Sequence, residues 1–403
     1  MLNDSISKKN ERLLLFGHST SSLGDLFFDY INKIFLVTNF TNKPWLLATY
    51  QSVEHIASAL FNVIGGTLAD CTDGKKILII CDLLSSFLCF LCAFFVDFPS
   101  FSIFLIVVNA LLALIFSFQS PCFRSIISQM IHKDDISKYN SKNSICLRII
   151  EIGGPLIAVA ISKIVGFQMA LIIDGITFLV SAVGEFKLSP IAKAEKIGFN
   201  KKGIVDGFQI IVKDKLLLIQ VLACLLSNFF MAGFNLLVPY TEIIYEGKVE
   251  NFYAKVLVVE AVGGLVGAFL CPKIKKELRG NSVFLLVTLS LEGLSLILVP
   301  LTSQVGGYVM FFIPFFLFDL SLSVYNINYM SFVQMNVKQE FQGRVFGIMF
   351  SLNVILMPIG SYLFSSLNFT NNIFGFSFLG IGIVAVSLIC VLLLILLSKK
   401  VTR

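Results

Sequence analysis

The chain has 403 residues, of which 56% are hydrophobic and only 14% are charged. Soluble globular proteins average about 45–50% apolar and about 25% charged residues, so this composition excludes a water-soluble domain, a disordered chain and a nucleic-acid-binding protein. The net charge of +6 is too small to coat a polyanion, and the distribution of the cations is more informative than their sum. The composition indicates a polytopic membrane protein.

Long apolar runs recur along the whole chain, separated by short polar links. A helix needs about 20 apolar residues to cross a hydrocarbon core of about 30 Å. Open strands cannot satisfy their backbone groups in lipid, so we expect an all-α membrane protein. The runs predict twelve transmembrane helices, at 13–38, 45–69, 77–97, 101–128, 144–163, 168–187, 216–239, 252–272, 282–302, 307–334, 345–367 and 374–397.

The longest polar stretch, 188–215, divides the predicted helices into two groups of six. We therefore expect an N-terminal six-helix bundle over residues 1–187 and a C-terminal six-helix bundle over residues 216–403, related by pseudo-symmetry. The stretch between them is predicted to be a cytoplasmic linker. Its apolar and basic residues alternate from Gly203 to Lys215, which favours a short interfacial helix.

The distribution of Lys and Arg predicts the orientation in the membrane. If the N-terminus lies inside, cytoplasmic segments hold 26 of the 31 cations, because the outer side and the spans hold only five. Cytoplasmic loops are enriched in Lys and Arg, so both termini are expected in the cytoplasm, in a cell inner membrane. The segment before the first span, Met1 to Arg12, is hydrophilic, and no cleavable signal peptide is expected. The five exceptions are Lys33, Lys43, Lys163, Lys248 and Lys255.

Two similar stretches follow the second and eighth predicted spans. The first runs from Gly66 through a short turn to Lys75-Lys76, and the second runs from Gly267 through a turn to Lys275-Lys276. Two six-helix halves with traces of duplication are typical of secondary transporters, whose substrate site lies near the midplane of the membrane between the repeats.

The stretch Gly66-x-x-x-Asp70, followed by Lys75-Lys76, resembles the signature loop between helices 2 and 3 of the major facilitator superfamily. The resemblance covers essentially the whole chain and is closest to the macrolide-efflux and enterobactin-exporter-like branch. The sequence departs from this pattern at Cys71 and Gly74, where basic residues are usual, and at Ile150, where a glycine is usual. The marks of the branch are Ser22-Leu23-Gly24-Asp25, Asp73, Ile77-Leu78 with Asp82, Gly154-Pro155, Asp174 to Phe178, and Gly343-Arg344-Val345-Phe346-Gly347.

Polar residues in the first span form one stripe. Ser22, Asp25, Asp29 and Lys33 follow each other at steps of three, four and four residues, which places them on one helical face. A charge at the centre of a bilayer costs about 2.5–3.5 kcal/mol, so we expect this face to line the central cavity. Asp29 and Lys33 can form a purely structural ion pair. Alternatively Asp25 or Asp29 carries protons, and we favour Asp25 because it lies farther from Lys33.

Further ionisable residues lie within predicted spans and are candidates for the cavity. Glu54, beside His55, can carry a proton, receive a cationic drug or bond a neighbouring helix. The C-terminal candidates are Glu260, Glu292, Asp319 and Asn326, the last between Tyr325 and Tyr329. In the fifth span, Arg148 and Glu151 are predicted to pair close to Gly154 and Pro155. Cys89 and Cys92 form a C-x-x-C pattern within an apolar span, where we expect them to act as small hydrophobic filler.

The signature loop predicts a conformational gate. Asp70 is expected to face the N-terminus of helix 11 near Gly343 and Arg344, where a helix dipole favours an anion by about 0.3–2 kcal/mol. This contact would tie the two halves together on the cytoplasmic side. The loop could instead serve only to fix the topology through Lys75 and Lys76. Gly66, Asp73 and Asp82 are assigned to the same region.

The features predict a secondary active transporter, and the family resemblance implies proton-coupled efflux of amphipathic drugs or natural products, macrolide-like or siderophore-like, by alternating access. An importer on the same scaffold is the alternative. An integral-membrane enzyme would need a clustered site, whereas the three histidines, His18, His55 and His132, are scattered. No catalytic residue, metal or cofactor is expected besides the proton gradient. The expected partners are the lipid bilayer, a small-molecule substrate and protons, without nucleic acid, and the protein is expected to be a monomer.

Overall fold

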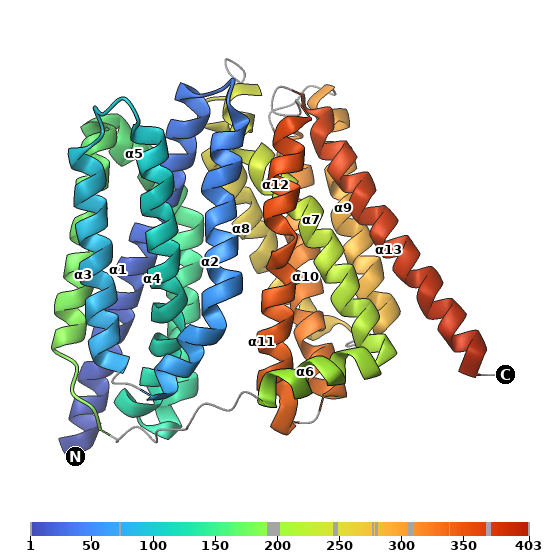
Figure 1. Ribbon diagram of the computed structural model, residues 1–403, viewed down its shortest axis with the longest axis horizontal. Coiled ribbons are helices and arrows are strands. Elements are labelled where there is room, and N and C mark those ends of the chain that lie inside the picture. The colour runs from blue at the N-terminus through green and yellow to red at the C-terminus, as the bar shows by residue number, and fades with distance from the viewer. Residues whose placement is uncertain are drawn as a thin grey trace. The chain divides into compact units, whose positions relative to one another are not determined.

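In the computed structural model, the described residues form helices joined by short turns, with no strand among them (Figure 1). The chain separates into two compact units, Met1–Phe199 and Asn200–Arg403. The predicted all-α architecture is therefore confirmed. For some residues, 62–71 and 341–344 among them, the structure describes the backbone alone. The described residues are 2–71, 74–191, 202–244, 249–275, 278, 281–304, 309–337, 339–367 and 372–401.

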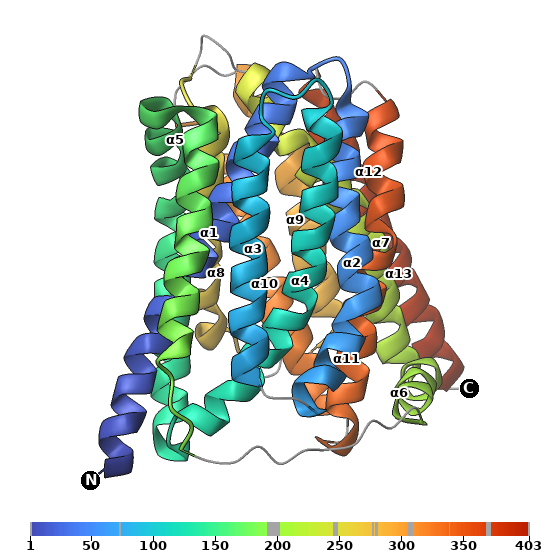
Figure 2. The same cartoon turned by 60° about the vertical axis from the view of Figure 1, so that its left-hand side comes forward.

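The described residues of the N-terminal unit form five helices, of which the last holds two of the predicted spans. Within the unit, α1 packs along α5, α2 packs along α4, and α3 lies between α4 and α5 (Figure 2). The helices are α1 (Leu2–Asn39), α2 (Pro44–Cys71), α3 (Gly74–Phe94), α4 (Phe101–Met130) and α5 (Lys133–Phe186).

Gly166 divides α5 into the two predicted spans 144–163 and 168–187. Its φ of 81° and ψ of 169° are not helical and belong to a region that glycine adopts without the steric cost of a side chain. The chain reverses here, because Gly154 on one side and Thr177 on the other both meet residues 24–26 of α1. A turn of this kind needs almost no loop residues, so the sequence has no polar stretch that marks its position.

The C-terminal unit has α10 packed against α8 and α9, α13 against α9 and α7, and α12 against α7. The eleventh predicted span is interrupted at Leu356, before Pro358, which cannot donate a backbone hydrogen bond. A short helix, α6, is present where the sequence favoured one, and its place at a membrane surface stays a prediction. The elements are α6 (Lys202–Lys213), α7 (Lys215–Ile244), α8 (Phe252–Leu270), the 3-10 turn η1 (Cys271–Lys273), α9 (Ser282–Gln304), α10 (Ile313–Asn336), α11 (Gln339–Ile355), α12 (Met357–Ser366) and α13 (Phe374–Val401).

Eight stretches of the described residues are long and apolar enough to cross a membrane. One of them, Lys142–Phe186, has 45 residues, enough for two crossings. Helices α1, α2 and α10 are also long, and they carry the acids Asp29, Glu54 and Asp319. The protein is a multi-pass membrane protein. The eight stretches are Gly74–Phe94, Phe101–Ser120, Lys142–Phe186, Lys215–Ile244, Phe252–Lys273, Ser282–Ser303, Val345–Ser366 and Phe374–Leu397.

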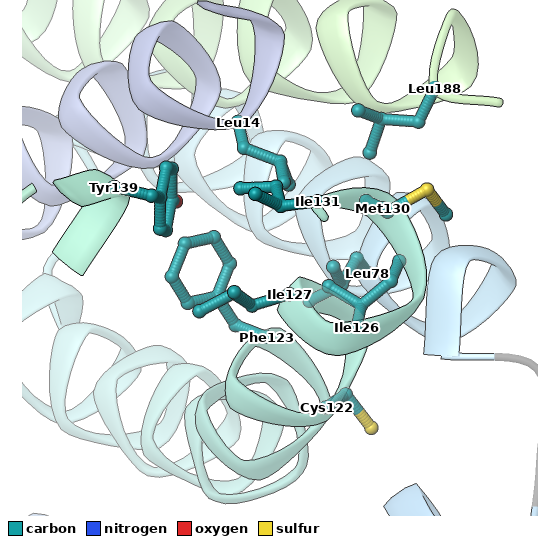
Figure 3. Close-up of a cluster of buried hydrophobic side chains, with 10 residues drawn as sticks. All are labelled: Leu14, Leu78, Cys122, Phe123, Ile126, Ile127, Met130, Ile131, Tyr139 and Leu188. Carbon is teal, nitrogen blue, oxygen red and sulfur yellow. The ribbon is translucent and has the colours of Figure 1, made fainter. Parts of the chain in front are cut away.

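A cluster of buried apolar side chains closes one end of the N-terminal unit, where α1, α3, α4 and α5 meet (Figure 3). Beside it, the buried Asn10 side chain donates to the carbonyl oxygens of Met130, at 2.9 Å, and Ser189, at 2.7 Å. These bonds tie the start of α1 to the ends of α4 and α5. The cluster, called the apolar end cluster below, consists of Leu14, Leu78, Cys122, Phe123, Ile126, Ile127, Met130, Ile131, Tyr139 and Leu188.

Candidate functional site

The predicted polar stripe of α1 contains an ion pair. Lys33 Nζ donates to Asp29 Oδ2 at 2.7 Å, as expected for residues one turn apart. The second oxygen, Asp29 Oδ1, is buried and has no hydrogen-bond partner among the described residues. The ion pair therefore satisfies only half of the Asp29 carboxylate.

Glu54 on α2 lies beside this ion pair. The amide nitrogen of Asn109, a buried residue of α4, donates to Glu54 Oε1 at 3.1 Å and to the carbonyl oxygen of Tyr50 at 2.8 Å. Asp29 and Lys33 both act electrostatically on Glu54. The three side chains thus form one charged site, built by α1 and α2 and supported from α4.

Asp25 extends this site along α1. Its side chain is exposed, and it lies within electrostatic range of Asp29, Glu54 and Asp82. We call Asp25, Asp29, Lys33 and Glu54 the N-terminal charged group. The group has three carboxylates and one ammonium, which would leave two negative charges in excess if every acid were ionised.

The C-terminal candidates also converge, on three neighbouring helices. Glu260 on α8 and Glu292 on α9 both interact electrostatically with Asp319 on α10. Glu292 is only 1% exposed, and neither of its carboxylate oxygens has a hydrogen-bond partner among the described residues. A Cβ atom at Gly264 would collide with Asp319 Oδ2, so a glycine on α8 is needed for Asp319 to lie there. We call Glu260, Glu292 and Asp319 the C-terminal acid group.

The polar stretch that follows Asp319 divides between two faces of α10. Tyr325 and Tyr329 are buried, and their rings stack with centroids 5.5 Å apart. Asn326 lies between them in the sequence and is exposed. The structure therefore places Asn326 away from the buried tyrosines.

The signature-loop residues are only partly described. Lys75 Nζ donates to the carbonyl oxygens of Phe186, at 2.8 Å, and Leu188, at 2.7 Å, and so ties the start of α3 to the end of α5. Lys76 is exposed. Asp73 lies outside the described residues, as do the side chains of Asp70 and Arg344, and Gly66 and Gly343 are described as helical backbone in α2 and α11. The expected contact between Asp70 and the start of α11 stays a prediction.

The predicted pair on α5 is present at the helix surface. Arg148 Nη1 donates to Glu151 Oε2 at 2.6 Å, and both side chains are 44% exposed. One turn farther, Gly154 and Pro155 are buried, and a Cβ at Gly154 would press against the Leu26 side chain of α1. This region brings α1 and α5 close together.

Three acids are buried inside the N-terminal unit, on α3 and α5. Asp82, which was expected to belong with the signature loop, has an Oδ1 that accepts from Gln119 Nε2 of α4 at 2.5 Å, and its relation to the loop stays a prediction. Cys89 was expected to be hydrophobic filler, but its thiol donates to Asp174 Oδ2 at 3.1 Å. Glu185, near the end of α5, is buried as well. A signal was present, because Asp174, Thr177, Ser181 and Glu185 repeat the steps of three, four and four seen in the first span.

A profile of the Major Facilitator Superfamily matches residues 14–361, which is most of the chain. The chain belongs to the major facilitator superfamily. This confirms the family predicted from the signature loop, and it makes the protein a member of a family of membrane transporters rather than of enzymes.

Two relatives of this major facilitator protein match most of its length at low identity. Macrolide efflux protein A of Streptococcus pyogenes is 23% identical over 375 residues, which cover 89% of each chain. Macrolide efflux protein A of Enterococcus faecalis is 23% identical over 317 residues, which cover 75% of this chain and 94% of the relative.

Solved structures of transporters share the fold. The nucleoside transporter NupG superposes with a TM-score of 0.77 at 12% identity, covering 94% of this chain and 98% of its own. The peptide transporter POT in complex with alafosfalin gives a TM-score of 0.73 at 14% identity, with coverages of 95% and 93%. A bacterial homologue of the iron transporter ferroportin gives 0.72 at 17% identity, with coverages of 94% and 96%. The predicted major facilitator fold is therefore confirmed.

Proposed function

We propose that this transporter is a proton-coupled exporter of macrolide-like amphipathic compounds, placed in the cytoplasmic membrane with both termini in the cytoplasm. Transport itself follows from the family. The direction and the substrate class rest on the similarity to two relatives named macrolide efflux protein A. The orientation rests on the 26 of 31 cations assigned to the cytoplasmic side.

The N-terminal charged group is the observation that supports proton coupling. Its three carboxylates share one ammonium, and Asp29 Oδ1 is buried without a hydrogen-bond partner among the described residues. Uncompensated charge at membrane depth costs several kcal/mol. Binding a proton or a cationic substrate removes this cost, so the two ligands compete for the same acids.

Competition of this kind is the physical basis of antiport. A site open to the outside takes up protons, and the same site open to the cytoplasm releases them when an amphipathic cation binds in their place. Binding of either ligand neutralises the acids and permits the change of state, whereas the unloaded, charged site opposes it. The C-terminal acid group can contribute in the same way, because Glu292 is fully buried beside Asp319.

Import by symport would use the same acids and is the second candidate. In a symporter, proton and solute bind together rather than in competition. The direction of net movement separates the two functions, so a test of transport must measure accumulation inside cells.

The test is accumulation of radiolabelled erythromycin, a macrolide, in a host that lacks its own efflux pumps. We expect the wild-type protein to lower accumulation and a protonophore to abolish this effect. Asp25→Asn should lose the effect, whereas the control Asp97→Asn, which changes an exposed acid outside the helices, should retain it. Raised accumulation would indicate import, unchanged accumulation would exclude macrolide export, and full activity of Asp25→Asn would remove Asp25 from coupling.

A further inference from the structure

Three acids buried inside the N-terminal unit take no part in the function proposed above. Asp82 on α3 and Asp174 on α5 are 0% exposed, and Glu185 on α5 is 5% exposed. Ionisable residues at membrane depth are rare because each is costly, and they mark functional sites more often than not. We call these three residues the buried acid line.

The second half of α5 connects two members of the line by hydroxyl groups. Asp174, Thr177, Ser181 and Glu185 lie on one helical face. Eleven residues separate Asp174 from Glu185, which at 1.5 Å per residue is about 16 Å, or half of the hydrocarbon core. The polar stripe therefore leads from the middle of the unit to the end of α5.

Helices α1 and α3 cover this stripe closely. On α1, Gly24 lies against Asp174 and Thr177, and a Cβ at Gly17 would lie 3.4 Å from Ser181 Oγ. On α3, the Ser86 hydroxyl donates to the carbonyl oxygen of Gly175 at 2.7 Å. The stripe is thus an internal polar seam of the unit.

The acids of the line have unused hydrogen-bonding capacity. Asp174 Oδ1 and Glu185 Oε2 are buried and have no hydrogen-bond partner among the described residues. A buried carboxylate oxygen without a donor is costly, and a proton on the carboxyl group relieves that cost. These two oxygens are the observation, beyond the clustering of acids, that points to protons as the ligand.

The acids also interact with one another electrostatically. Asp25 interacts electrostatically with Asp174 and Asp82, and Asp82 interacts with Glu185. Among the described residues, the thiols of Cys81, Cys89 and Cys92 on α3 also face the line, beside the amide of Gln119 on α4, and Cys122 on α4 interacts electrostatically with Cys81. His18 on α1 is turned toward α4 and α5, where it stacks on Phe123 and bonds with Asn143.

We infer that Asp174, Asp82 and Glu185 form a proton-transfer line inside the N-terminal unit, joining Asp25 to the end of α5 that our topology places in the cytoplasm. The inference rests on the proposed proton coupling. A proton that leaves the Asp25 carboxyl group binds an ionised carboxylate of the line, and that acid passes a proton on toward Glu185. Each transfer moves one proton and restores one carboxylate, so no other reactant is needed.

The apolar end cluster lies next to Asp82 and Glu185 along α3 and α5. Leu78 lies four residues before Asp82 on α3, and Leu188 lies three residues after Glu185. Apart from the Cys122 thiol and the Tyr139 hydroxyl, its side chains offer no group that exchanges a proton, so the cluster acts as a barrier to leakage. Proton release then requires the cluster to loosen, which would make release depend on the conformation of the unit.

The first test compares Glu185→Gln and Asp174→Asn with the control Asp97→Asn in liposomes that contain a trapped pH-sensitive dye. We expect the rate of proton movement driven by an erythromycin gradient to be at least about tenfold lower in both variants than in the wild-type protein. They should retain erythromycin exchange at equal pH on both sides, because that exchange needs no net proton transfer. Wild-type proton movement in both variants would overturn the line, and so would loss of exchange together with proton movement.

The second test does not depend on the substrate and so separates the line from the proposed function. Infrared difference spectra between two pH values report the carbonyl stretch of buried carboxyl groups that gain or lose a proton. We expect such a band in the wild-type protein, weakened in Glu185→Gln and unchanged in Asp97→Asn. A band that Glu185→Gln and Asp174→Asn both leave intact would overturn the line even where macrolide transport is present.

Discussion

The amide nitrogen of Asn109 on α4 bonds with Glu54 Oε1 at 3.1 Å and with the carbonyl oxygen of Tyr50 at 2.8 Å, so one buried side chain fixes an acid to its own helix. Because Asn109 donates both bonds with one nitrogen, its loss leaves a backbone carbonyl and a carboxylate oxygen without this donor. Unpaired buried polar groups cost about 1–3 kcal/mol each.

We therefore expect Asn109→Ala to lower the melting temperature of the purified protein and to reduce macrolide transport. Thermal unfolding in detergent measures the first effect, and accumulation in cells measures the second. Asn39→Ala, at the exposed end of α1, is the control and should change neither. A variant with normal stability and normal transport would show that Asn109 does not position Glu54.

Lys33 supplies the positive charge of the N-terminal charged group. We expect its removal to shift the pH profile of transport. Lys33→Gln takes away the ammonium that pairs with Asp29 and acts electrostatically on Glu54. By Coulomb's law the charged group then binds an added proton more tightly, and release of that proton needs a higher pH. The pH of half-maximal transport should therefore rise.

Proton-driven uptake into inverted vesicles, measured over a series of internal and external pH values, tests this sign. Lys43→Gln, at an exposed position between α1 and α2, is the matched control and should leave the profile unchanged. A downward shift in Lys33→Gln would contradict the assignment of Asp29 and Glu54 to proton binding.

The fold could be predicted because its main determinant is local. A helix must be long enough to cross the hydrocarbon core of the bilayer, and the length of an apolar run in the sequence gives the length of that helix directly. Pairs within one helix could be predicted for the same reason, and both Asp29–Lys33 and Arg148–Glu151 are present. The helix reversal at Gly166 was predicted as a boundary between spans, but its single-residue geometry was not.

Contacts between helices could not be predicted in the same way. Asn109 and Glu54 are 55 residues apart, and Cys89 and Asp174 are 85 residues apart. Which faces meet depends on the rotation of each helix, and a helix that is apolar all round carries little information about its rotation. For this reason the bond from Cys89 to Asp174 and the bond from Gln119 to Asp82 were not predicted. The stripe from Asp174 to Glu185 was not predicted because Glu185 lies at the end of its predicted span.

The turn at Gly166 predicts a strong effect of a small substitution. A side chain at φ 81° and ψ 169° meets its own backbone, at a cost of about 1–3 kcal/mol. Gly166→Ala should therefore lower the melting temperature of the protein, although open space surrounds the position. Gly153→Ala lies in the same helix in ordinary helical geometry and should be neutral or stabilising by up to about 1 kcal/mol. Equal melting temperatures for the two variants would show that Gly166 does not hold the turn.

A substitution at Gly264 can test the C-terminal acid group while all its acids stay in place. A Cβ at this position collides with Asp319 Oδ2, so Gly264→Ala must push the carboxylate away from α8 or push α8 away from α10. Either movement separates Asp319 from Glu260, and misplacing a functional group by about 1 Å can cost about a hundredfold in rate.

We expect Gly264→Ala to abolish macrolide transport while the protein is still inserted and folded, as judged by its elution in detergent. The control Val262→Ala changes a partly exposed side chain of the same helix and should retain transport. Because the substitution adds only one methyl group and removes no charge, loss of transport in Gly264→Ala alone would mean that the position of Asp319 matters. Full transport in Gly264→Ala would instead indicate that proton coupling takes place in the N-terminal unit alone.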